Sequence, residues 1–189
     1  MKTRLVLAGT AVALAAAAVP AVLLLSTRAS NGPGPLGGGS LDAQACFPVQ
    51  HAGSVAQDDF MNKTTAPIRV LKLDLIHAHG VRLTGVNLVP ILSARGGWDL
   101  LTTGGPYPPT RSSLTATPDA HWNDRRTLPM TMSPDQSGHS WNLVFGVERT
   151  APTGTAGYQL EYEWKGNRYI WSSRVALKLV SESCIPDHS

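Results

Sequence analysis

Two pairs of residues in the sequence have the side chains and the spacing of a metal site. His77 and His79 are two residues apart, so both imidazoles would lie on one face of a strand. Met130 and Met132 share this spacing, and thioethers with imidazoles suit Cu(I), while imidazoles also suit Zn(II). The competing interpretation is that the histidines are solvated and the methionines pack in a core. Additional ligands would come from His51, His121 and His139.

Three further patterns resemble parts of hydrolytic sites, but each of them is incomplete. The run from Gly138 to Asn142 approaches a nucleophile elbow, yet it ends in asparagine where a second glycine belongs and it opens a strand. The pair Asp58-Asp59 and the acidic cluster 119–124 supply carboxylates without a spacing that sets them against each other. No phosphate-binding or dinucleotide-binding loop is present in the sequence. We therefore expect a protein that is not an enzyme and that binds no cofactor.

A proline- and glycine-rich stretch, residues 93–140, carries aromatic side chains among polar ones. Long loops in compact domains are often functional, and rigid aromatic side chains anchor partner proteins at a low entropic cost. Trp98, Tyr107 and Trp122 are therefore candidate partner-binding residues. The alternative is that these side chains fold back onto a sheet and serve the structure. A glycosylation sequon, Asn62-Lys-Thr64, matters only in a host that glycosylates.

The elements that would position these residues are β-strands. Leu71, Leu73 and Leu75 alternate with polar residues, which predicts a half-buried strand over 68–78. A turn at His79-Gly80 and a second alternating stretch over 81–92, with a bulge at Gly85, follow it. The sequence predicts that the two stretches form an antiparallel pair.

The C-terminal part of the chain, from residue 141 onwards, has the clearest strand pattern. Two alternating stretches, 141–147 and 158–164, each place large apolar side chains on one face. Gly166 and Asn167 suit the positive φ angles of a tight turn before a return strand that carries Tyr169 and Trp171. We expect this aromatic face to be sheet core, with a binding platform for carbohydrate or peptide as the alternative.

Helix signals after Leu25 are limited to single turns at 42–46 and 55–61. The sequence therefore predicts an all-β domain over residues 45–186, an antiparallel Ig-like β-sandwich of about seven to nine short strands. The immunoglobulin pattern of two central cysteines with a tryptophan between them is missing. Cys46 and Cys184 lie instead at the two ends of the domain, where a disulfide between them would close it.

The N-terminal region predicts export. Leu5 to Leu25 is an uncharged run long enough, at about 1.5 Å per residue, to cross a bilayer as a helix. Lys2 and Arg4 precede it, which favours an N-terminus inside the cell and a C-terminal domain outside. The expected organisation is a cytoplasmic n-region (1–4), a single-pass transmembrane signal anchor (5–25), a flexible Gly/Pro linker (26–44) and the extracytoplasmic domain. Cleavage near Ala29, giving a secreted protein, is the alternative.

Charge excludes one class of partner. Of the 16 basic residues, Lys2 and Arg4 precede the apolar run, so 14 basic residues face 13 acidic ones beyond it. A near-neutral domain without a basic stripe is not a nucleic-acid binder. The expected function is that of a membrane-anchored binding or interaction module at the cell envelope. Its partners would be the lipid bilayer, through residues 5–25, and an envelope protein or a cell-wall component. The alternative is a surface copper- or zinc-binding protein.

Overall fold

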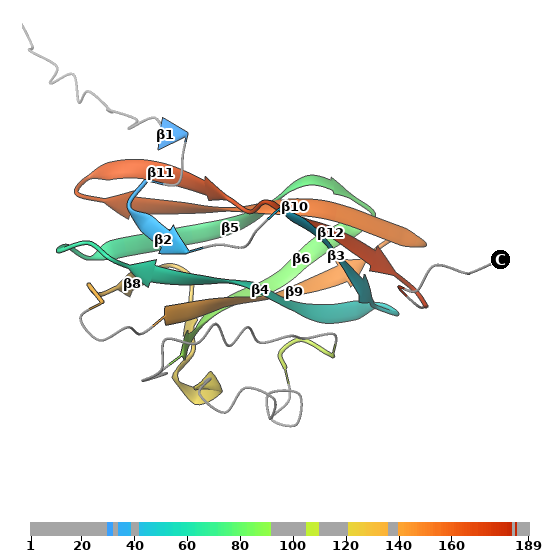
Figure 1. The fold of residues 1–189 in the computed structure, drawn as a ribbon. Helices are drawn as coiled ribbons and strands as arrows, with labels where there is room; N and C mark the ends of the chain where they lie inside the picture. The colour runs from blue at the N-terminus through green and yellow to red at the C-terminus, as the bar shows by residue number, and fades with distance from the viewer. Residues whose placement is uncertain are drawn as a thin grey trace, which may run out of the picture.

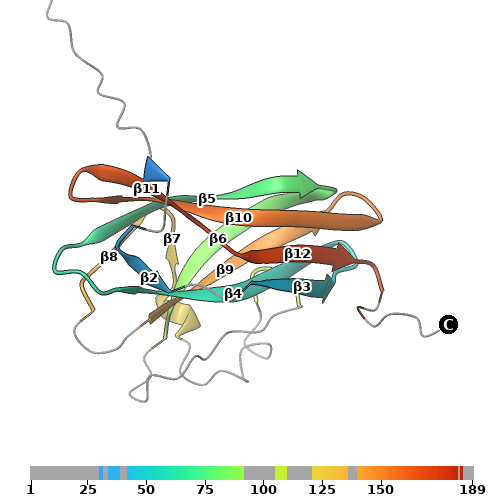
Figure 2. The same ribbon diagram turned by 45° about the horizontal axis from the view of Figure 1, so that its top comes forward.

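The structure is a computed structural model, and it describes residues 30–31, 34–38, 42–91, 105–109, 121–135, 140–182 and 184. These residues form two stacked β-sheets, which Figures 1 and 2 show as layers. The strands before residue 92 are β1 (Ser30–Asn31), β2 (Leu36–Gly38), β3 (Ala43–Pro48), β4 (Ala52–Asn62), β5 (Ile68–His79) and β6 (Val81–Ile91). A short 3-10 helix, η2 (Trp122–Asp124), then precedes β7 (Arg126–Thr127), β8 (Met130–Met132), β9 (Ser140–Arg149), β10 (Thr153–Trp164), β11 (Asn167–Ser172) and β12 (Val175–Val180).

Each sheet is organised around one long strand. In the β10 sheet, β11 and β12 pair with successive parts of β10 on one side, and β5 pairs with it on the other. This sheet is extended by β1 beside β11, β3 beside β12 and β8 beside β5. The β9 sheet has the order β2-β4-β9-β6-β7. The described strands pair antiparallel except for β1 with β11 and β3 with β12, so the predicted β-sandwich is confirmed with two parallel pairs added.

The core between the sheets is formed by the alternating faces that the sequence predicted. Leu143 and Phe145 from β9, and Tyr158 and Leu160 from β10, are completely buried. Aromatic rings from the two sheets meet there, with Phe145 and Tyr158 at 4.9 Å between ring centroids. The C-terminal aromatic face is therefore core, because period-two alternation places every second side chain between the layers.

The predicted pairing of the strands at 68–78 and 81–92 is wrong, although both strands exist. β5 pairs with β10, whereas β6 pairs with β9 in the other sheet. His77 and Gly80 have positive φ angles of 50° and 60° at the corner between these strands. The chain therefore crosses from one layer to the other at this corner instead of forming a hairpin. Alternation defines the buried face of a strand but not its neighbour.

The tight turn between β10 and β11 lies one residue earlier than predicted. Positive φ angles occur at Lys165 (48°) and Gly166 (77°) instead of at Gly166 and Asn167. Trp164 and Asn167 are directly opposite each other, so the hairpin has a two-residue loop. Two consecutive positive φ angles are typical of the type I′ turn, whose twist matches that of the flanking strands.

The predicted flexible linker over 26–44 is wrong for the residues that the structure describes. β2 and the first residues of β3 lie within this range, and Leu36 is only 3% exposed in the core. A Cβ atom at Gly34 would lie 2.3 Å from the Tyr162 hydroxyl oxygen. Glycine is thus needed for close packing, and a glycine-rich composition did not mean an unstructured chain. The helical turns considered at 42–46 and 55–61 are likewise strands, β3 and β4, paired with β12 and β9.

The predicted n-region and membrane anchor, residues 1–4 and 5–25, lie outside the described residues. Within the part of the chain that the structure describes, no helix has the length and hydropathy to span a bilayer.

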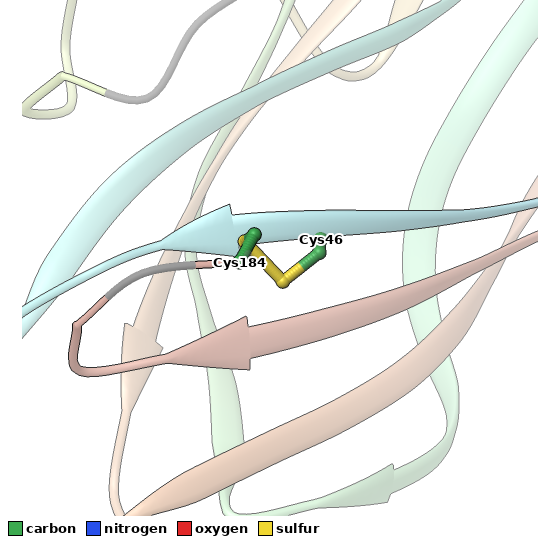
Figure 3. The surroundings of a disulfide bond; sticks show 2 residues. All are labelled: Cys46 and Cys184. Atoms are coloured by element: carbon green, nitrogen blue, oxygen red, sulfur yellow. A yellow bond between two sulfur atoms is a disulfide. The ribbon is translucent and has the colours of Figure 1, made fainter. Parts of the chain in front are cut away.

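The predicted disulfide between Cys46 and Cys184 is confirmed. Figure 3 shows the bridge between β3 and the segment that follows β12, and the two Cα atoms are 5.8 Å apart. β3 runs parallel to β12, with Cys46 opposite Lys178. The bridge therefore links β3, at one edge of the β10 sheet, to the segment that follows its neighbour β12.

A carboxylate lies inside the sandwich. Asp58 is 1% exposed, and its Oδ2 atom accepts hydrogen bonds from the Tyr158 hydroxyl and, at 3.1 Å, from the Ser173 hydroxyl. The register of β4 against β9 shifts between Ala56 and Asp58. This bulge turns Asp58 towards the core. The hydrogen bond between Asp58 and Tyr158 links β4 of one sheet to β10 of the other.

Tyrosine titration gives a test of this core. Burial raises the pKa of Tyr158 well above its usual value, and burial also raises the pKa of Tyr162 to about 12. Folded pKa values above the unfolded value of about 10 mean that stability is fully present below pH 10 and decreases as the pH rises through the folded values. We expect these two tyrosines to stay unionised at pH 11 until the protein unfolds. The absorbance of tyrosinate measures their ionisation. Ionisation of all four tyrosines with a native circular dichroism spectrum would contradict this packing.

Candidate functional site

The residues of the predicted metal site are not brought together. Met130 pairs with Val70, which lies seven residues before His77 on β5, a separation of about 23 Å along the strand. His77 and His79 are exposed near the corner at Gly80, whereas Met130 and Met132 are 8% and 0% exposed in the core. Among the described residues, no three histidine, cysteine or acidic side chains are grouped as metal ligands. The proposed combination of histidines and methionines in one site is therefore wrong.

The residues of the hydrolytic patterns are also separated. Asp58 points into the core, so its neighbour Asp59 faces the other side of β4, and the two carboxylates do not form a catalytic pair. Desolvation raises the pKa of Asp59, which is 6% exposed. Ser140 is buried at the start of β9 and is followed by strand, not by the helix that a nucleophile elbow requires. Asp119 lies outside the described residues, and Asp124 is exposed beside His121 at 3.4 Å.

The sequon is closed to modification in the folded protein. The Nδ2 atom of Asn62, which would carry the glycan, donates to the carbonyl oxygens of Ala66 (3.0 Å) and Met132 (2.9 Å). Asn62 is 1% exposed. Its side chain thus fastens the loop between β4 and β5 to β8.

Two of the three candidate partner-binding residues lie together, on the outer face of the β9 sheet. Tyr107 and Trp122 pack against a small cluster of Ala56, Val89 and Val144. Figure 1 shows η2, which carries Trp122, on this side of the sandwich. Tyr107 accepts a hydrogen bond from Asn87 and lies so close to Gly146 that a Cβ atom there would be 2.5 Å from the tyrosine ring. Both side chains are half-buried supports of the sheet rather than free anchors, and Trp98 lies outside the described residues.

A pocket of about 780 Å³ lies next to these supports. After η2, the chain passes from β7, which belongs to the β9 sheet, to β8, which belongs to the β10 sheet. The pocket lies at this crossing. Its volume is within the range of roughly 300–1,000 Å³ that is typical of small-ligand sites. The described residues that line it are Asn87, Asn123, Arg125, Arg126, Thr127, Pro129, Met130, Thr131 and Trp141.

The pocket is cationic. Arg125 and Arg126 line it, and none of its described lining residues is acidic. The guanidinium of Arg125 is held over the Trp122 ring, with Cζ 4.8 Å from the ring centroid, and its Nη1 atom donates to the Trp122 carbonyl oxygen. Within the described chain, neither arginine forms an ion pair. The described lining of the pocket therefore carries two guanidinium groups and no carboxylate.

The outer face of the β10 sheet shows a different arrangement of charge. There Arg168 lies 2.9 Å from Glu161 and 3.2 Å from Glu163, and Arg69 lies 3.3 Å from Glu163. These cations are neutralised by carboxylates of the neighbouring strands. The arginines of the pocket therefore differ from the arginines of this face in being available to an external anion.

Asn87 adds a buried acceptor to the pocket. Its side chain is 5% exposed, and its Nδ2 atom donates to the Tyr107 hydroxyl. Its Oδ1 atom has no hydrogen-bond partner among the described residues. A buried acceptor without a partner is uncommon in native proteins and is costly unless a ligand or water satisfies it. The described lining of the pocket thus combines two guanidinium groups with part of the Asn87 side chain.

Sequence reasoning missed this pocket. Its residues come from β6, from the segment 123–131 and from β9, and only the crossing between sheets brings them together. One signal was present, the adjacent basic residues Arg125 and Arg126 after Trp122. Trp141, predicted as a core residue, is half-buried and lines the pocket from the start of β9.

Comparison with known proteins gives no family. No family model matches the chain, and no curated protein matches it. A VesB protease from Vibrio cholerae is similar over 78% of this chain, at 10% identity and a TM-score of 0.35, and the chain spans about a third (32%) of that protein. A PapD-like domain of human CEP192 is similar over 80% of this chain and 87% of its own length, at 9% identity and a TM-score of 0.33. At these values neither likeness bears on the activity or partners of this chain, whose β-sandwich is defined by its own strand pairing.

Proposed function

We propose that this protein is a membrane-anchored, extracytoplasmic, Ig-like β-sandwich that acts as a binding module at the cell envelope. The uncharged run from Leu5 to Leu25 behind Lys2 and Arg4 supports an anchor with the N-terminus inside. The disulfide supports an oxidising compartment for the domain. The proposed role is non-catalytic: Asp58 and Ser140 of the hydrolytic patterns are buried in β4 and β9, whereas Asp124 is exposed on η2.

The pocket beside β7 and β8 is the observation that carries this proposal. Arg125 and Arg126 supply paired guanidinium groups, which bind carboxylate and phosphate oxygens in bidentate geometry. We infer that the ligand is an anionic cell-wall polymer that carries carboxylates or phosphates.

Substitution of the two arginines tests this function. We expect the full-length protein to bind an oligogalacturonate, as the carboxylate probe, or an inorganic polyphosphate, as the phosphate probe. The double substitution Arg125→Ala and Arg126→Ala should weaken this binding by about tenfold or more, because each charged hydrogen bond contributes about 1.5–3 kcal/mol. Isothermal titration calorimetry measures the effect, and binding should weaken as salt is added.

A matched control comes from Arg82, an exposed arginine outside the pocket that is paired with Glu148. The substitution Arg82→Ala should leave the affinity unchanged. A neutral cello-oligosaccharide should not bind, and preference for one anionic probe identifies the source of the anion. Equal loss of affinity in the control, or no binding of either anionic probe, would reject the pocket as the ligand site.

A further inference from the structure

The route of the N-terminal segment defines which end of the sandwich is nearest to the proposed anchor. β1 pairs in parallel with β11, with Ser30 opposite Tyr169 and Asn31 opposite Ile170. β11 starts at the tip of its hairpin with β10, the turn at Lys165 and Gly166. Because β1 runs in the same direction, it enters the sheet from the end of the molecule where this tip lies (Figure 1).

The length of chain between the anchor and β1 is short. Ser30 is five positions after Leu25 in the sequence, so their Cα atoms are at most about 18 Å apart. The tip extends about 10 Å beyond the level of Ser30, since Tyr169 is three positions after Gly166. The remaining distance of about 8 Å is comparable to the thickness of one headgroup layer, about 5–8 Å.

The chemistry of this end suits a membrane surface. Lys165 is exposed, with its Nζ atom 4.7 Å from the centroid of the Trp164 ring. Trp164 in turn donates from Nε1 to Thr64 in the loop between β4 and β5, so this loop lies beside the tip. That loop carries Lys63, which is also exposed, and neither lysine forms an ion pair with a described carboxylate. Tryptophan with lysine at one end of a domain is typical of contact with lipid headgroups.

At the opposite end of the sandwich, the described turns at 78–80 and 150–152 contain no lysine, arginine or tryptophan. Arg82 near these turns is paired with Glu148. Arg149 beside them is occupied by backbone carbonyl oxygens, including those of Val49 at 2.9 Å and Gln50 at 2.6 Å.

We propose that the hairpin tip at Trp164–Arg168 and the neighbouring loop at 63–67 rest on the bilayer surface that holds residues 5–25. The occupant of this surface is an anionic lipid headgroup layer, whose charge complements Lys63 and Lys165. This proposal rests on the anchor of the proposed function. In this arrangement the domain is held against the membrane in one orientation, instead of standing away from the membrane on a flexible linker.

Lipid quenching of single-site labels tests the orientation. The two native cysteines are paired, so an added cysteine provides a single free thiol for a fluorophore. Full-length protein with Asn167→Cys, at the tip, is compared with Pro152→Cys, at the opposite end, in phosphatidylcholine vesicles with about one third phosphatidylglycerol. A quencher attached to the lipid headgroups should reduce the fluorescence of the tip label several times more than that of the control label. Reversing the charges with Lys63→Glu and Lys165→Glu should reduce this difference.

The outcomes separate the two proposals. Equal quenching, or stronger quenching at Pro152, in protein that floats with its vesicles would overturn the orientation and leave the anchor intact. Protein that does not float with vesicles at all would overturn the anchor, and the orientation with it.

Discussion

Loss of the disulfide through Cys46→Ser and Cys184→Ser is expected to lower the free energy of unfolding by about 4–5 kcal/mol. The bridge spans 138 residues of sequence, so in the unfolded chain it removes the entropy of a very long loop. Such a loss is a large share of the roughly 5–15 kcal/mol that stabilises a typical domain. Urea unfolding of the oxidised protein and of the double variant measures the difference.

The location of the bridge gives this test a second readout. Without the covalent link, β3 is held at the edge of the β10 sheet mainly by its parallel pairing with β12. Amide exchange should therefore increase first in β3, ahead of the central strand β10. A variant that unfolds at the same urea concentration as the oxidised protein would show that the bridge contributes nothing. Two free thiols in exported protein would show that it does not form.

The substitution Tyr158→Phe is expected to lower the free energy of unfolding by about 1.5–3 kcal/mol, the usual contribution of a hydrogen bond to a charged group. It removes a donor from the Asp58 carboxylate, which is 1% exposed between the sheets. A buried acceptor that loses a donor retains the cost of its desolvation. Chemical denaturation monitored by tryptophan fluorescence provides the measurement.

Tyr169→Phe is the matched control for this substitution. Tyr169 stacks on Tyr162 with ring centroids 5.3 Å apart, and its hydroxyl group makes no hydrogen bond with a described residue. Removing that hydroxyl should change the stability by less than about 0.5 kcal/mol. If both variants lost the same free energy of unfolding, the hydrogen bond between Tyr158 and Asp58 would make no particular contribution to stability. Asp58 would then need another explanation for its burial.

Local pattern in the sequence was enough to predict strands and their buried faces. Every second residue along most of β10 is buried, and Leu143, Phe145, Tyr158 and Leu160 are all completely buried as expected. Pairing between strands was not accessible in the same way, because β5 and β6 look like a hairpin until the corner at Gly80 sends them to different sheets. The range 26–44 was misread because glycine permits both flexibility and close packing, and only the Tyr162 side chain beside Gly34 distinguishes the two.

The candidate site was less accessible to sequence reasoning than the fold. The disulfide followed from two cysteines placed at the ends of the predicted domain. The pocket, in contrast, depends on Asn87 and Arg126 being on adjacent strands of one sheet, while Met130 belongs to the other sheet. Residue spacing contains no information about a site built from three separate segments. The equal spacing of the histidine and methionine pairs suggested a shared site. In the structure the two pairs lie apart by more than half the length of β5.

The pairing of β3 with β12 has a consequence for the biogenesis of an exported chain. An exported chain leaves the membrane from its N-terminal side. Cys46 and β3 would therefore emerge long before β12 and Cys184, their partners in the finished sheet. During this interval the edge of β3 is unpaired and Cys46 is a free thiol, both of which favour association with other chains. Because the chain has only two cysteines, no incorrect intramolecular bridge can form. Errors of oxidative folding in this protein are therefore intermolecular disulfides, and a non-reducing gel separates those formed with other protein chains from the native monomer by size.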